Sequence, residues 1–259
     1  MNRLKFNNRM SITNYSNERL FHRLLNNKSS KNYWKYIGEL RKRTEKSVFQ
    51  KSSELIKSEK AKEKIIGINI LAQFGFPRLH LKQILKLYFN LLKTETDKNV
   101  ISSVFYGIGH NNEHLNDKQI DIICYYKDHK SVNVRHSLVY AILGVEKIKS
   151  IETLIQLSED KNSDIRNWAT FGLGTQITTD NEIIQDALWK RIKDKDEDTK
   201  FEAIVGLAKR KIKDIRNVLK NEVENMSFIN PLLIEAIEEF KDQELLFLLN
   251  QQIENKKLT

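Results

Sequence analysis

The sequence has few residues that cross-link or interrupt a chain: one cysteine, two prolines, and nowhere an apolar run of membrane-spanning length. A lone Cys124 excludes an internal disulfide and a zinc site built from several cysteines, and it suits a reducing compartment. The first residues also lack the roughly seven consecutive apolar residues of a secretory signal. We therefore expect a cytoplasmic protein without a membrane segment.

Motifs that carry chemistry are also missing. The sequence contains no glycine-rich phosphate loop, no G-x-S-x-G turn for a serine nucleophile and no H-E-x-x-H zinc motif. His110 and His114 fall in a predicted connecting segment without further ligands, so we expect no metal site. Cys124 lies in an apolar stretch and is expected to be a packed core thiol. We expect no catalytic residue and no cofactor; the sequence leaves enzymatic activity open and favours a role without catalysis.

The positive charge is confined to one end of the chain. Of 259 residues, 44 are Lys or Arg and 34 are Asp or Glu, a formal net charge of +10. Residues 1–64 hold 17 of the cations and 6 of the acids, and the remainder has a net charge of −1. One interpretation is a solvated helical cap whose lysines follow the codon usage of an AT-rich genome. The other is a segment that contacts phosphate through Arg41, Lys42 and Arg43, with aromatic side chains such as Trp34 available for stacking.

A pattern recurs every 31 to 37 residues. Segments 163–174 and 198–210 share a polar start, a basic residue, a small or apolar residue three positions later, and then a small residue, leucine and a small residue. The positions equivalent to Ala169 are Gly67, Val104, Leu138, Ala203 and Ala236. Such a period indicates stacked helical units that cannot bury their apolar faces alone.

Small residues recur three positions after this alignment column. The six positions hold Ile70, Gly107, Ala141, Gly172, Gly206 and Glu239. Because glycine inside a helix costs about 1 kcal/mol relative to alanine, its recurrence indicates that two helices approach closely. Amphipathic segments precede the column at 79–92, 118–126, 151–157, 183–192 and 215–223. We therefore predict an all-α protein of antiparallel helix pairs, with an irregular last repeat because Glu239 breaks the column.

Segments NSDIRNWATFGLG (162–174) and SVNVRHSLVYAILG (131–144) resemble the bacterial HEAT-repeat family, including the HEAT-like repeats named after phycobilisome lyases. The resemblance covers about residues 60–240. It implies a right-handed α-solenoid, a HEAT-like superhelix with the first helix of each pair on the convex face and the second helix lining the concave face. We divide the chain into a basic N-terminal helical cap (1–46), a repeat array (47–241) and a C-terminal capping helix and tail (242–259).

A column of cations follows the acids in the turns of the repeats. The cations are Arg135, Arg166 and Lys200, and six or seven residues before them stand Asp128, Asp160 and Asp194. In similar HEAT arrays such side chains form a ladder that holds neighbouring repeats together. The resemblance implies this structural role, and phosphate binding is the alternative.

Aromatic residues follow the alignment column by two positions, where a HEAT repeat usually carries a polar residue on its concave surface. Tyr106, Tyr140 and Phe171 occupy this position in successive repeats, and Trp168, His136 and Asn167 would flank them. Steps of about 10 Å between helices would make these rings a ladder, and exposed aromatic side chains in a groove are typical of binding sites. We expect all six residues to bind a partner; the alternative is a register shifted by one residue, with the rings packed between helices.

The leading functional prediction is a non-catalytic protein-binding scaffold or adaptor that uses its concave face. The alternative is a nucleic-acid-binding protein whose basic N-terminus contacts phosphate, similar to the HEAT-like DNA glycosylases that excise alkylated bases. Those enzymes combine a basic channel with aromatic residues and an essential Asp, whereas here the repeat region is nearly neutral and no Asp is in register beside the aromatic column. A bilin lyase has no support beyond the repeat itself.

Overall fold

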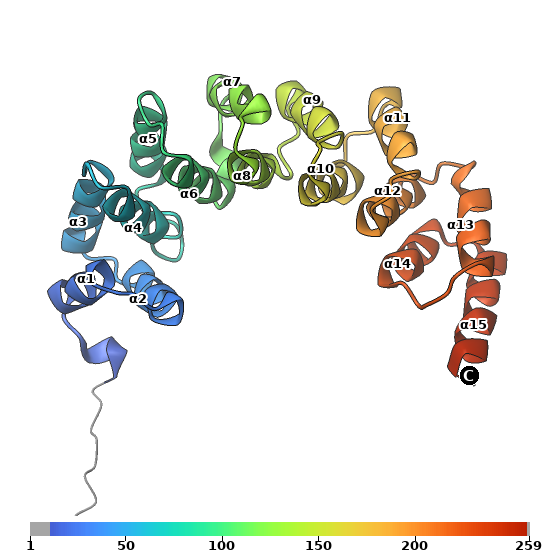
Figure 1. Cartoon of the computed structure of the whole chain (residues 1–259), viewed down its shortest axis with the longest axis horizontal. Helices are drawn as coiled ribbons and strands as arrows, with labels where there is room; N and C mark the ends of the chain where they lie inside the picture. Colours follow the sequence, from blue (N-terminus) through green and yellow to red (C-terminus); the bar gives the residue numbers. More distant parts are fainter. Residues whose placement is uncertain (1–10, 258–259) are drawn as a thin grey trace, which may run out of the picture. The chain divides into compact units, whose positions relative to one another are not determined.

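The computed structural model describes residues 11–257, and within this range every regular element is a helix. The helices follow one another in antiparallel pairs, and within each compact unit the second helices of successive pairs pack side by side (Figure 1). The chain divides into two compact units, a first unit that ends at Asn111 and a second unit that begins at Asn112. The predicted fold class, an all-α solenoid of stacked helix pairs, is confirmed.

The first unit holds three helix pairs after a short 3-10 turn. Its helices are α1 (Asn17–Leu25), α2 (Ser30–Lys42), α3 (Lys46–Ile56), α4 (Ala61–Leu71), α5 (Leu81–Leu92) and α6 (Lys98–Gly109), and the turn η1 is Ile12–Asn14. The second helices α2, α4 and α6 pack in order. Because α2 packs on α4, this helix of the predicted N-terminal cap continues the stack of the following pairs.

The second unit holds four pairs and a final helix. Its helices are α7 (Asp117–Cys124), α8 (Val132–Ile142), α9 (Ile148–Leu157), α10 (Ser163–Thr175), α11 (Glu182–Arg191), α12 (Glu197–Lys209), α13 (Ile215–Glu224), α14 (Pro231–Phe240) and α15 (Gln243–Lys257), with 3-10 turns η2 (Asn112–His114) and η3 (Tyr125–Asp128). Helices α8, α10, α12 and α14 pack in order, and α15 packs on α13 and α14. The five predicted amphipathic segments correspond to α5, α7, α9, α11 and α13. The pair α13 and α14 stacks on α12 although Glu239 interrupts the small-residue column.

Polar residues in the turns set where the helices begin. Asn162 and Asp196 accept the backbone N–H groups of residues three positions ahead and so cap α10 and α12. Asn116 and Gln119 form a reciprocal capping box at α7. Ser131 precedes α8, but its side chain makes no capping hydrogen bond there.

Glycines permit the close approach of second helices. A Cβ atom on Gly206 of α12 would lie 2.5 Å from the Cα of Gly174 on α10, a distance that real Cβ contacts do not reach. In the first unit, a Cβ on Gly67 of α4 would lie 2.4 Å from the carbonyl oxygen of Ser52 on α3. Gly206 and Gly67 therefore mark helix contacts that exclude larger side chains. None of the helices among the described residues combines the length and the apolar character that crossing a bilayer requires.

Candidate functional site

Four aromatic side chains of the second unit gather on its second helices. His136 and Tyr140 lie one turn apart on α8, and Trp168 and Phe171 lie on α10. Edge-to-face contacts join the rings of His136 and Trp168, with centroids 6.4 Å apart, and those of Trp168 and Phe171, 5.6 Å apart. Trp168 is 42% exposed and the other three side chains are half-buried. We call these four residues the aromatic patch.

The predicted aromatic column is divided between the two units. Tyr106, which is 38% exposed, lies on α6 of the first unit, whereas Tyr140 and Phe171 share the second unit with their predicted flanks. Asn167 adjoins the patch with a buried Oδ1 that accepts no hydrogen bond within the described part of the chain. On α12 the equivalent position is Val205, which is fully buried, so the column of rings ends there. A binding role for the six predicted residues stays a prediction.

Three carboxylates extend the exposed face beyond the aromatic patch. Glu202 on α12 and Glu235 on α14 occupy the position that Trp168 occupies on α10, and Asp198 lies one turn before Glu202. Burial raises the pKa of Glu202 to about 7, and the charges of Glu235 and Asp198 add to the rise. We call Asp198, Glu202 and Glu235 the acidic row. These three acids were not predicted from the sequence, although Glu202 and Glu235 recur at the position before the alignment column.

Two arginines of the second unit form forked ion pairs with an aspartate of the next repeat. Each aspartate lies in the turn after the first helix of that repeat. Arg135 donates through Nε and Nη2 to the carboxylate of Asp160 at 2.6 and 2.9 Å, and Arg166 does the same to Asp194 at 2.9 and 2.8 Å. Burial would raise the pKa of Asp194, but hydrogen bonds from Arg166 and from a backbone N–H outweigh it and hold that pKa below its usual value. Each pair therefore joins one repeat to the next.

Other members of the expected ladder take different partners. Asp128 accepts a hydrogen bond from the side chain of Gln156 at 2.8 Å. The arginines bind the carboxylate of the next acidic turn, and to the preceding turn they donate only through Nη1, to backbone carbonyl groups. Lys200 pairs with Glu222 at 2.6 Å. In the first unit, Lys64 pairs with Glu95 at 2.6 Å.

The basic triplet Arg41, Lys42 and Arg43 is mostly engaged inside the first unit. Arg41 donates to the carbonyl of Asn69 at 2.9 Å and to the side chain of Gln73 at 2.8 Å, and burial lowers its pKa. Arg43 donates to two backbone carbonyl groups that precede α1 and to an acid on its own helix. Only Lys42 of the three is exposed. Two of the three predicted phosphate contacts are therefore occupied by the protein itself.

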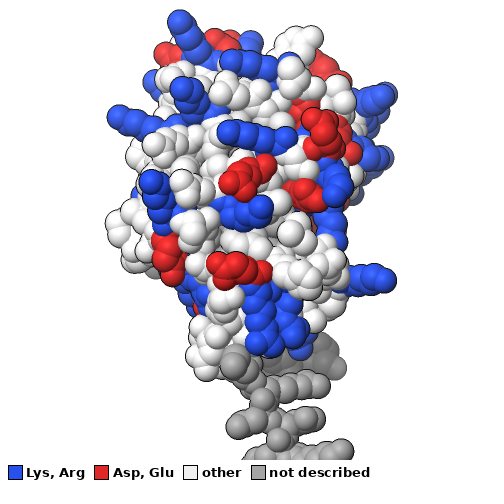
Figure 2. Space-filling view, turned by 90° about the vertical axis from the view of Figure 1, so that its left-hand side faces the viewer, with Lys and Arg blue, Asp and Glu red and all other residues white. Residues whose placement is uncertain are grey.

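Cations at the N-terminal end of the chain are interspersed with acids. On the face drawn in Figure 2, Lys and Arg side chains alternate with acidic and uncharged ones. Lys51 pairs with Glu54 at 3.2 Å and Lys60 with Glu63 at 3.0 Å. The charge of this region is therefore distributed and does not form one continuous basic band on this face.

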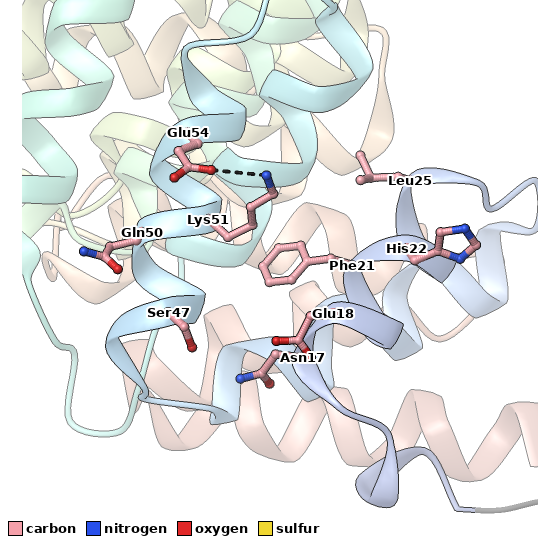
Figure 3. Close-up of a pocket in the computed structure, with 9 residues that line it drawn as sticks. All are labelled: Asn17, Glu18, Phe21, His22, Leu25, Ser47, Gln50, Lys51 and Glu54. Atoms are coloured by element: carbon pink, nitrogen blue, oxygen red, sulfur yellow. Dashed lines mark hydrogen bonds and ion pairs between the residues drawn. The ribbon is translucent and has the colours of Figure 1, made fainter.

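An open pocket of about 460 Å³ lies between α1 and α3 (Figure 3). Phe21 and Leu25 are apolar lining residues, and Phe21 lies between Glu18 and the Lys51–Glu54 ion pair. The remaining lining residues are Asn17, His22, Ser47 and Gln50. The pocket could admit an apolar side chain.

His110, His114 and Cys124 are each affected by neighbouring groups or by burial. Burial and the nearby charges of Arg41 and Arg78 lower the pKa of His110 to about 4, and its ring nitrogen Nδ1 lies 2.9 Å from the amide nitrogen of Gln73. His114 pairs with Glu113 at 3.0 Å. No group of three or more potential metal ligands occurs among the residues described. Burial raises the pKa of the Cys124 thiol.

Comparison with known proteins adds one bacterial relative. No protein-family model matches the chain. Protein YibA of Escherichia coli strain K12 is 36% identical over 124 residues, which are 48% of this chain and 44% of YibA, and YibA of strain O157:H7 matches equally. An X-ray structure of E. coli YibA aligns with a TM-score of 0.74 and 26% identity, over 93% of this chain and 87% of that one. The chain is thus similar to YibA in fold over most of its length, while the matched sequence spans less than half the length of these curated relatives.

Proposed function

We propose that this chain is a non-catalytic scaffold of the HEAT-repeat kind that binds a partner protein in the bacterial cytoplasm. The observation that carries the proposal is the aromatic patch, in which Trp168 remains 42% exposed although it contacts Phe171 and His136. Tryptophan and tyrosine dominate the energetics of protein interfaces because they bury large areas at a small conformational cost. The second helices place these rings on one surface of the second unit, as a binding face requires.

Other features of the second unit support a role in binding. Its arginine–aspartate pairs lie within the stack, and its cysteine is buried, so neither offers a reactive group at the patch. A rigid stack of helix pairs holds the rings in place before a partner arrives, which reduces the entropy lost on binding. The buried Cys124 also fits a reducing cytoplasm.

Affinity capture with matched variants tests this proposal. The triple variant Y140S/W168S/F171S should lose at least about tenfold of the partner retained from an extract of the native host, since each buried hot-spot ring contributes about 2 kcal/mol. The control Y125S/F247S removes two aromatic side chains that are 85% and 64% exposed on other surfaces, and it should retain the partner. Equal retention by both variants would refute the proposal.

Nucleic-acid binding is the second candidate because the first unit carries a large excess of cations. The chain up to Asn111 holds 22 Lys and Arg against 8 Asp and Glu. Trp34, 53% exposed, lies 5.9 Å from the guanidinium of Arg41. Binding to random single- and double-stranded nucleic acid at two salt concentrations tests this candidate. A steep loss of affinity with salt that disappears on removal of residues 1–46 supports it, and absence of binding at low salt refutes it.

A further inference from the structure

The exposed face of the second unit changes character from one second helix to the next. Trp168, Glu202 and Glu235 occupy equivalent positions on α10, α12 and α14, separated by 34 and 33 residues. Helix α12 packs against both neighbours, so the three side chains lie on successive rows of one stack. Packed helices are about 8 to 10 Å apart, which sets the step between these positions. An aromatic row is therefore followed by two carboxylate rows.

The acidic row differs from the ladder in its ion pairs. None of Asp198, Glu202 and Glu235 forms a salt bridge within the part of the chain described, whereas Asp160 and Asp194 of the ladder are each bound by an arginine. Glu202 is partly buried beside Glu235 and Asp198, whose charges raise its pKa. The charge of Lys209, on the same helix as Glu202, opposes this rise. The negative charges of neighbouring carboxylates repel one another, so a cation placed between them would be bound favourably.

The charge of the whole second unit agrees with this local pattern. From Asn112 onward the chain holds 22 Lys and Arg against 26 Asp and Glu, a net charge of −4, although the complete protein is strongly basic. A cationic ligand would be attracted to this unit and an anionic one repelled. The neighbouring Trp168 offers a ring face or edge against which the apolar stem or the charged head of Lys or Arg can pack.

We infer that the aromatic patch and the acidic row together bind an extended basic peptide, with one Lys or Arg side chain at each carboxylate row and an apolar side chain or a further cation at Trp168. This inference rests on the proposed function and names the chemistry of its partner. A polyproline II segment advances about 9 Å in three residues and returns its side chains to the same side. Its repeat matches the step between second helices, so the expected ligand carries a cation at every third position.

Fluorescence anisotropy with two labelled peptides tests the inference. The first peptide contains four Lys-Pro-Ala triplets, and the second replaces each Lys by Glu. We expect the full-length protein to bind the Lys peptide with a Kd below about 1 mM and to leave the Glu peptide unbound. Failure to bind the Lys peptide at low salt, or equal binding of both peptides, overturns the inference.

Matched variants locate the binding site. E202Q/E235Q should weaken binding of the Lys peptide at least tenfold. The control E182Q/D186N removes two exposed acids from α11, the first helix of its pair, and so has the same net charge. It should change the binding less than twofold. Equal effects of the two double variants would show that only net charge attracts the peptide and would overturn the inference. W168S should weaken binding without changing its dependence on salt, because it removes a ring and no charge.

The pH dependence of binding provides a second measurement. The charged groups that act on Glu202 are Glu235 on α14 and Asp198 and Lys209 on α12. A bound cation favours the ionised carboxylate, so the Lys peptide should bind about three- to tenfold more tightly at pH 8 than at pH 6, and E202Q should abolish this difference. A pH dependence that persists in E202Q overturns the assignment to this carboxylate.

The outcomes for the peptide and for the proposed function remain separate. If Y140S/W168S/F171S loses the captured partner while the wild-type protein ignores the Lys peptide, the scaffold function stands and the basic-peptide inference falls. If the triple variant retains the partner, the proposed function falls, and peptide binding lost in E202Q/E235Q would then describe a separate site.

Discussion

The two units use the same helix-pair architecture with different polar contacts. In the second unit, Arg135 and Arg166 each bind an aspartate in forked geometry, and these acids also accept backbone N–H groups at the following turn. In the first unit, Arg41 and Arg43 donate largely to backbone carbonyl and uncharged groups, and Lys64 makes a single contact with Glu95. A regular side-chain ladder is therefore not required for the stack: close packing of second helices supports both units.

The units also differ in charge and in what they expose. The first unit has a net charge of +14 and the second −4, so the second unit is acidic although the whole chain is basic. Many cations of the first unit are neutralised or used within its fold, whereas the acidic row of the second unit has no cation bound to it in the described residues. Charge left uncompensated on a stable framework is a better indicator of binding than total charge.

The largest effect should come from the ladder of the second unit. D194N leaves the guanidinium of Arg166, only 6% exposed, without its anionic partner, and we expect a loss of about 3 kcal/mol in the free energy of unfolding. E95Q removes the partner of Lys64, which is a more exposed and more flexible cation, and should cost about half as much. Guanidinium titration followed by far-UV circular dichroism measures both. Equal losses would show that the forked pairs contribute no more than the single contact.

The second effect concerns glycines that look alike in the sequence. G206A places a methyl group 2.5 Å from the Cα of Gly174, and we expect it to destabilise the protein by about 1 to 2 kcal/mol despite the better helix propensity of alanine. G38A in α2 of the first unit meets nothing within 4 Å and should stabilise the protein by about 0.5 to 1 kcal/mol. Thermal denaturation of the two variants should therefore shift in opposite directions. A shift of the same sign would mean that the helices of the second unit can separate without penalty.

These contrasts show which features can be predicted from the sequence. The helix pairs and the close helix contacts follow from periodicity and from recurring glycine, because both reflect local sterics. The partner of Arg135 does not follow, since Asp128 precedes it and Asp160 follows it at plausible spacings, and only the packing of consecutive turns selects the second. The hydrogen bonds of Arg41 inside the first unit could not be predicted either, because the sequence does not distinguish a buried arginine from a solvated one.

Residues of the candidate site were predicted unevenly for a similar reason. Phe171 stands out as an aromatic residue in a column that is usually polar, Trp168 was predicted as its flank, and the structure leaves Trp168 exposed. Glu202 and Glu235 occupy the same repeat position as Trp168, yet a glutamate on a helix is ordinarily a solvated residue. The sequence does not show that these two glutamates have no cation paired with them in the described part of the chain. The division of the aromatic column between units is also a property of tertiary contacts that a repeat alignment does not contain.

The third effect distinguishes the acidic row from the neutralised charges of the first unit. The pKa of Glu202 is raised to about 7, above the value of about 4.5 for a solvated glutamate, so the folded state binds more protons between these values. Stability contributed by this group is therefore lost as the pH rises from 4.5 to 7. E202Q should raise the Tm by about 2 °C at pH 8, allowing for screening at a partly exposed carboxylate, and have little effect at pH 4. The same increase at both pH values would rule out charge repulsion as the cause.

The smallest effect concerns a surface contact that also belongs to the second unit but has the opposite pH dependence. The Glu146 carboxylate accepts hydrogen bonds from the side chains and backbone N–H groups of Thr178 and Thr179, and these bonds lower its pKa to about 2. Its contribution to stability is fully present above the unfolded value of about 4.5 and is lost as the pH falls towards 2. E146Q should therefore lower the Tm by about 1 °C at pH 7 and by nothing measurable near pH 2, because the carboxylate is exposed. E152Q, which removes only the exposed pair with Lys149, should leave the Tm unchanged at both pH values. If E146Q and E152Q behave alike, the hydrogen bonds that Glu146 accepts from Thr178 and Thr179 add nothing to stability, and the contrast between compensated and uncompensated acids in this unit would rest on Glu202 alone.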